Sequence, residues 1–104
     1  MKIIFKVKTV FEKKVSLTEE RLNHILFKHP ELIGKTEKIR DTLISPGVIR
    51  KSQYNSRIWL FYKFNRGMKK YLTVVVKLID SQGFLVTAYV TDRIKLGEEI
   101  WKEK

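Results

Sequence analysis

Two histidines, His24 and His29, are the residues of this chain best suited to acid and base chemistry. They lie in a segment with an amphipathic helical pattern that also contains Arg21 and Lys28. Imidazole exchanges protons near neutral pH, and cleavage of a phosphodiester needs such a group beside cations. The segment therefore predicts a site that could cleave phosphodiesters, although a basic surface helix would show the same pattern.

The two histidines are expected to have different roles. Arg21, His24 and Lys28 fall at spacings of three and seven, so they share one stripe outside the core-facing side of the helix. His29 directly precedes Pro30, where a helix should end, and we expect it mainly to cap the helix terminus. The pair lacks the i, i+4 spacing of a metal-binding helix, so the sequence predicts no metal site.

Composition predicts one compact domain over residues 1–104. The chain is 43% hydrophobic and contains no cysteine, which excludes disulfides, thiolate catalysis and cysteine zinc sites. Lysines interrupt the apolar residues of 1–8, and the longest uncharged apolar stretch, 71–76, is too short to cross a bilayer. We expect a cytoplasmic protein with no cofactor and no membrane association.

Positive charge is concentrated in one third of the chain. The formal net charge is +11, and residues 47–79 carry eight Lys or Arg and no Asp or Glu. Such a surplus is typical of proteins that bind polyanions, because each neutralised phosphate releases counterions. Lysines that keep strand edges soluble are the alternative explanation. The charge pattern favours RNA as a partner.

The pattern of elements predicts an α+β fold with an N-terminal strand, two helices and then a four-stranded antiparallel sheet packed against the helices. Residues 2–10 alternate as in a strand, and Ser16-Leu17-Thr18-Glu19 fits a capping box that begins a helix ending near Lys28. A second helical segment covers 31–45, and Gly34 could break it. The expected strands, joined by short turns, are 48–51, 58–64, 71–79 and 84–91. Residues 98–104 are expected to form a short amphipathic tail.

Alternation within these strands predicts a basic and aromatic platform. Phe84, Val86, Ala88 and Val90 should face inward, which leaves Leu85, Thr87, Tyr89 and Thr91 outward. Strand 58–64 is ambiguous, because both of its faces are apolar or aromatic. If Lys63 faces outward, one platform contains Trp59, Phe61, Lys63, Thr73, Lys77, Thr87 and Tyr89, where bases could stack beside cations and hydroxyls. Trp59 and Phe61 could equally belong to the core.

An ordered set of segments resembles the phage-associated branch of the barnase, EndoU, colicin and RelE-like nuclease superfamily. The segments are Leu17-Thr18-Glu19-Glu20-Arg21, His24-Ile25, His29-Pro30-Glu31-Leu32, Asp41-Thr42-Leu43 to Pro46, Tyr71-Leu72-Thr73-Val74-Val75-Val76, Thr87-Ala88-Tyr89 and Lys95-Leu96-Gly97. The resemblance implies a small α+β domain and metal-independent RNA cleavage. It places the candidate catalytic residues at His24, Lys63, Thr87 and Tyr89, with Arg57 as an alternative to Lys63.

Three functions are compatible with these observations. The first is a toxin-like or phage-derived endoribonuclease, in which His24 is the base or acid for attack by the RNA 2′-hydroxyl. The second is a noncatalytic nucleic-acid-binding module, and the third is an interaction protein for an acidic partner such as an antitoxin. The predicted nucleic-acid-binding residues are Arg21, Lys28, Arg57, Trp59 and Lys77.

Overall fold

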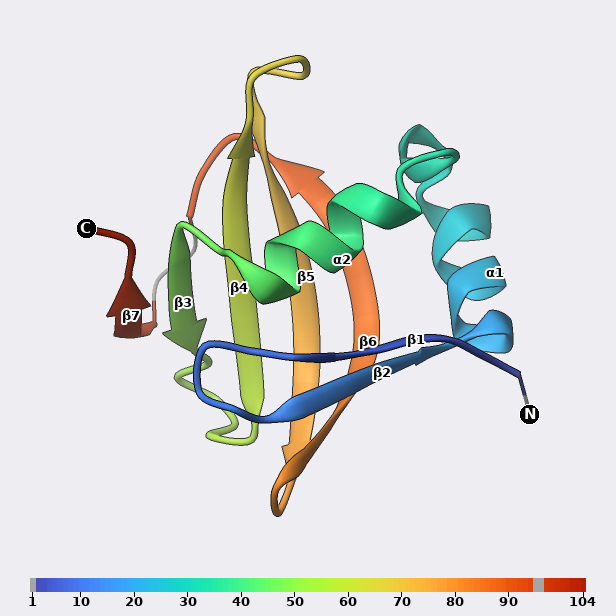
Figure 1. Ribbon diagram of the computed structural model, residues 1–104. Helices are drawn as coiled ribbons and strands as arrows, with labels where there is room; N and C mark the ends of the chain where they lie inside the picture. Colours follow the sequence, from blue (N-terminus) through green and yellow to red (C-terminus); the bar gives the residue numbers. More distant parts are fainter. Residues whose placement is uncertain (1, 95–96) are drawn as a thin grey trace.

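The computed structural model describes residues 2–94 and 97–104, which form one mixed sheet with helices packed on it (Figure 1). The elements follow the order β1 (Ile3–Lys8), β2 (Lys14–Thr18), α1 (Glu19–Lys28), the 3₁₀-helix η1 (Pro30–Leu32), α2 (Thr36–Ile44), β3 (Val48–Lys51), β4 (Ile58–Asn65), β5 (Lys70–Ile79), β6 (Gln82–Thr91) and β7 (Glu98–Lys102). Lys95 and Leu96, part of one segment quoted above, lie outside the described residues. In those described, neither α-helix is long and apolar enough to cross a bilayer.

The expectation of a four-stranded antiparallel sheet is wrong, because the described residues form a sheet of seven strands in the order β1-β2-β6-β5-β4-β3-β7. The four expected strands are present as β3 to β6, but β1 and β2 extend the sheet beyond β6 and β7 extends it beyond β3. β2 runs parallel to β6, and the other neighbours are antiparallel. These additions satisfy backbone groups that would otherwise be exposed along β6 and β3.

Helix α1 begins two residues later than the capping box predicts. The Thr18 side chain accepts a hydrogen bond of 3.2 Å from the Arg21 backbone N–H, so Thr18 is the N-cap and Ser16 belongs to β2. The predicted break near Gly34 is confirmed, because η1 ends at Leu32 and α2 begins at Thr36. Gly34 has a φ of 79°, a conformation that glycine adopts readily.

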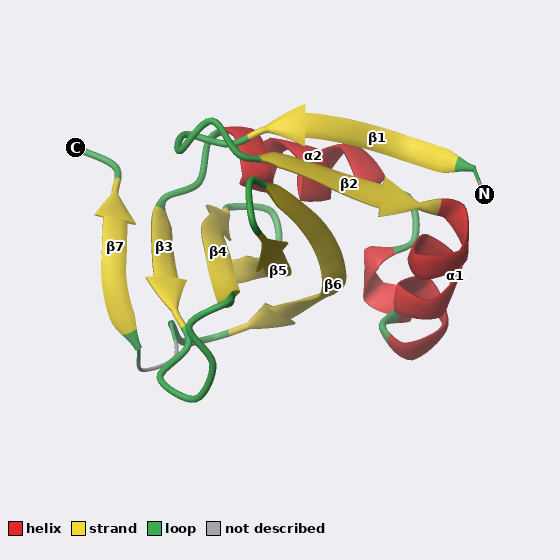
Figure 2. Cartoon of the chain, turned by 90° about the horizontal axis from the view of Figure 1, so that it is seen from below, coloured by secondary structure: helices red, strands yellow, loops and turns green. Residues whose placement is uncertain are grey.

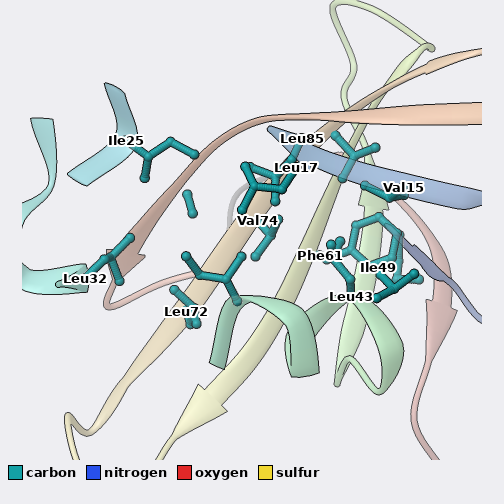
Figure 3. Packing of buried hydrophobic residues seen from close by; sticks show 14 of the residues in the cluster. Val15, Leu17, Ile25, Leu32, Leu43, Ile49, Phe61, Leu72, Val74 and Leu85 are labelled. Atoms are coloured by element: carbon teal, nitrogen blue, oxygen red, sulfur yellow. The ribbon is translucent and has the colours of Figure 1, made fainter. Parts of the chain in front are cut away.

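The core is formed on the face of the sheet that α2 crosses at β4 and β5, which we call the helix-covered face, and it extends to β1, β2 and α1 (Figures 1 and 3). α1 packs instead against β2 and β6 (Figure 2). We call the opposite side of the sheet the outer face. The fully buried apolar residues of the core include Val15, Leu17, Ile25, Ile39, Leu43, Ile49, Val74 and Val76. Residues 98–102, expected as a tail, form an edge strand.

A bulge in β6 reverses the expected facing of its first residues. Val86 has no partner, because the pairing with β5 shifts by one residue there. Leu85 consequently turns inward and is 3% exposed, whereas Phe84 turns to the outer face and is 46% exposed. The inward assignment of Phe84 and the outward assignment of Leu85 are therefore wrong. Thr87 and Tyr89 lie on the outer face, as alternation predicts.

Candidate nucleic-acid interface

The predicted platform is divided between the two faces of the sheet. In register, Lys63 lies opposite Leu72 and Phe61 opposite Val74, which places the β4 members of the platform on the helix-covered face. The members of β5 and β6, namely Thr73, Lys77, Thr87 and Tyr89, lie on the outer face. The candidate catalytic Lys63 therefore cannot act at one point with Thr87 and Tyr89.

The β4 members of the platform support the packing of the domain. Phe61 is 1% exposed in the core, and the Trp59 ring meets Phe11 edge-on with ring centroids 5.2 Å apart. The Trp59 indole N–H also donates to the Ser56 carbonyl at 3.3 Å. These contacts hold the predicted stacking residue Trp59 against the protein. Arg57 is exposed in the loop before β4.

The structure brings His29, and not His24, to Tyr89. The rings of His29 and Tyr89 have centroids 6.2 Å apart, and His29 Nδ1 lies 3.6 Å from a Glu31 carboxylate oxygen. The helix end is capped by the His29 backbone N–H, which donates to the Ile25 carbonyl at 2.7 Å. His24 is exposed one turn after Arg21, and its imidazole forms no hydrogen bond or ion pair with another described residue.

Two of the predicted nucleic-acid-binding residues, Arg21 and Lys77, meet in a groove of about 490 Å³ that we call the outer groove. It lies among β1, β2, β5, β6 and the start of α1. Neighbouring strand positions place Lys6 beside Ser16, Ser16 beside Phe84 and Phe84 beside Lys77. The outer groove therefore combines three cations with an aromatic ring that is about half exposed.

The three cations of the outer groove have no ion-pair partner among the residues that the structure describes. Glu20 is the one carboxylate among the groove's described lining residues, and Lys6, Arg21 and Lys77 form no ion pair within the described chain. Lys8 and Lys14 are cross-strand neighbours and continue the basic surface along β1 and β2. The outer groove can therefore attract an anion.

The acid-free segment 47–79 is partly neutralised by the C-terminal part of the chain. The pairs are Arg50 with Glu99 at 4.0 Å, Lys51 with Glu98 at 3.5 Å and Lys70 with Asp92 at 3.5 Å. Two of these pairs exist because β7 lies beside β3. Charge counted along the sequence therefore overstates the charge available for a ligand in this segment.

Sequence reasoning missed Lys6 and Phe84. Alternation did separate Lys6 from the apolar side of its strand, but no local signal indicated that β1 would lie near Lys77. Phe84 was assigned inward because strict alternation takes no account of the bulge at Val86. Lys28, which was predicted to bind nucleic acid, does not line the outer groove.

Comparison of the chain with models of protein families, with curated proteins and with solved structures finds no match. The resemblance to the nuclease superfamily therefore depends on the quoted segments alone. The outer groove and the contact between His29 and Tyr89 are the features of the structure that indicate a function.

Proposed function

We propose that this protein binds single-stranded nucleic acid, RNA in particular, through the outer groove. The observation that carries the proposal is the convergence of Lys6, Arg21 and Lys77 around the half-exposed ring of Phe84. Cations without carboxylate partners can neutralise phosphates, and an exposed aromatic ring can stack on a base. A base inside a duplex does not offer its face to a protein ring, so the combination favours a single strand.

Replacement of Phe84 by alanine is expected to weaken binding of a short single-stranded RNA about tenfold, because stacking on one base contributes about 1–3 kcal/mol. Fluorescence anisotropy with a labelled oligonucleotide measures the affinity. Phe27→Ala is the matched control, since Phe27 is 86% exposed and does not line the outer groove. Equal affinities of the two variants would contradict the proposal. Capture of an acidic protein without affinity for RNA would favour the interaction function instead.

Metal-independent RNA cleavage is the second candidate function, and the position of His29 favours it. An imidazole, a phenol and a carboxylate come together where His29 meets Tyr89 and Glu31. In this proposal His29 takes the proton of the RNA 2′-hydroxyl, whose oxygen attacks the phosphorus and displaces the 5′-oxygen. The protonated His29 then returns the proton to the leaving 5′-oxygen, while Tyr89 donates a hydrogen bond to a phosphate oxygen. The histidine differs from the one that the sequence favours.

Cleavage of RNA in the presence of EDTA is expected to fall at least 100-fold in His29→Ala, because a positioned acid or base contributes about 10²–10⁴-fold. His24→Ala is the matched variant, because it removes an exposed imidazole from the same helix. Loss of cleavage in His24→Ala alone would restore the role assigned to His24 from the sequence. Undiminished cleavage in both variants would exclude both histidines.

A further inference from the structure

A second basic groove lies between α2 and the hairpin formed by β4 and β5, which projects beyond the sheet at the top of Figure 1. This hairpin groove has a volume of about 580 Å³. Lys35 and Lys38 line it from the start of α2, and Lys63 and Arg66 line it from β4 and the hairpin turn. It shares no lining residue with the outer groove.

The four cations of the hairpin groove are unpaired within the described part of the chain. They face a single lining carboxylate, Asp41, and none of them forms an ion pair with it or with another acid there. By contrast, Lys51 and Lys70 on the same sheet each have a carboxylate within 3.5 Å. Like charges on opposite walls of a groove repel one another, so an anion between them would stabilise this arrangement.

Hydrogen bonds hold the groove in shape and leave donors available. Lys63 Nζ donates to Ser45 Oγ at 2.9 Å, which positions the ammonium group beside the end of α2. The Asn65 side-chain oxygen accepts from the Met68 backbone N–H at 3.0 Å, which fixes the turn that carries Arg66. The amide N–H groups of Asn65 remain for another acceptor.

We propose that the hairpin groove binds a terminal phosphate monoester, either on a free nucleotide or at the 5′ end of a nucleic acid. A monoester carries about 1.5–2 negative charges and three acceptor oxygens, whereas a phosphodiester carries one charge. Cations on two opposite walls can surround such a group from both sides. Met68 adds apolar surface for the rest of a nucleotide, and the volume lies within the usual range of small-molecule sites.

Titration of the full-length protein with AMP and with adenosine, followed by NMR, tests this proposal. We expect saturable AMP binding, adenosine binding at least tenfold weaker, and AMP affinity at least tenfold lower in Lys63→Met/Arg66→Met, because hydrogen bonds to charged groups contribute about 1.5–3 kcal/mol. Lys38→Met, at an exposed position of α2, repeats the test without altering the sheet. Lys28→Met/Lys104→Met is the matched control, because both lysines are exposed and line neither groove, and it should bind AMP as the parent does.

Two RNA oligonucleotides that differ only in a 5′ phosphate identify the source of the monoester. Tighter binding of the phosphorylated RNA, lost in Lys63→Met/Arg66→Met, would assign the groove to a strand end. Equal binding of both RNAs together with AMP binding would assign it to a free nucleotide. The proposal is overturned if AMP and adenosine bind alike, or if the groove variants bind AMP as tightly as the parent.

Discussion

Replacement of Phe61 by alanine is expected to lower the free energy of unfolding by about 3–5 kcal/mol. Phe61 is 1% exposed, and it lies between Ile49 of β3 and Val74 of β5 in the register of the sheet (Figure 3). Removing the ring loses its burial and leaves a cavity that the surrounding strands and α2 can close only in part. Since small domains are stable by only about 5–15 kcal/mol, the loss is a large part of the total.

Urea unfolding followed by circular dichroism measures this loss. Phe64→Ala is the matched control, because Phe64 lies on the same strand, faces the other side of the sheet and is 50% exposed. Its ring meets Tyr71 edge-on at 5.3 Å, and losing that contact should cost about 1 kcal/mol. Equal losses in the two variants would contradict the assignment of Phe61 to the core.

Local patterns located the central strands well and the edge strands poorly. The turn residues at 65–67 and 80–83 interrupt alternating segments, so the bounds predicted for the strands between them agree closely with β4, β5 and β6. Residues 14–18 alternate too, with Val15 and Leu17 buried, but their Ser-x-x-Glu pattern also fits a helix start. Parallel pairing of β2 with β6 joins residues far apart in sequence and leaves no local signal.

The residues that form the candidate site are placed by a bulge and by contacts between distant segments, which the alternation of residues within one strand does not predict. A bulge forms where one strand must match the register of another, so the sequence of β6 alone does not show that Val86 loses its partner. Phe84 reaches the outer groove for this reason. The position of His29 before Pro30 predicts a role in capping the helix end. The end of α1 also lies beside β6, so the His29 ring contacts Tyr89. The positive charge of Arg21 and Lys77 predicts that they bind nucleic acid, but the sequence does not show that both line the same groove.

Replacement of Lys6, Arg21 and Lys77 together by methionine is expected to weaken binding of single-stranded RNA by about 500-fold at ~50 mM salt. Each phosphate neutralised on a single strand contributes about 0.7 to the slope of log affinity against log salt, which amounts to about eightfold per contact at that salt concentration. The three cations line one groove and have no carboxylate partners among the described residues, so each is available for a phosphate.

The dependence of RNA affinity on salt distinguishes a built site from a general attraction. In the variant that lacks Lys6, Arg21 and Lys77, which we call the groove variant, the slope of log affinity against log salt should be shallower by about two. Its loss of RNA affinity relative to the parent should therefore shrink to about fourfold near 500 mM salt. Lys28→Met/Lys69→Met/Lys104→Met is the matched control, because it removes the same number of charges from exposed positions outside the outer groove. If this control loses as much affinity and slope as the groove variant, RNA is attracted by the overall positive field of the protein. A loss confined to the groove variant identifies these three side chains as the contacts to phosphate.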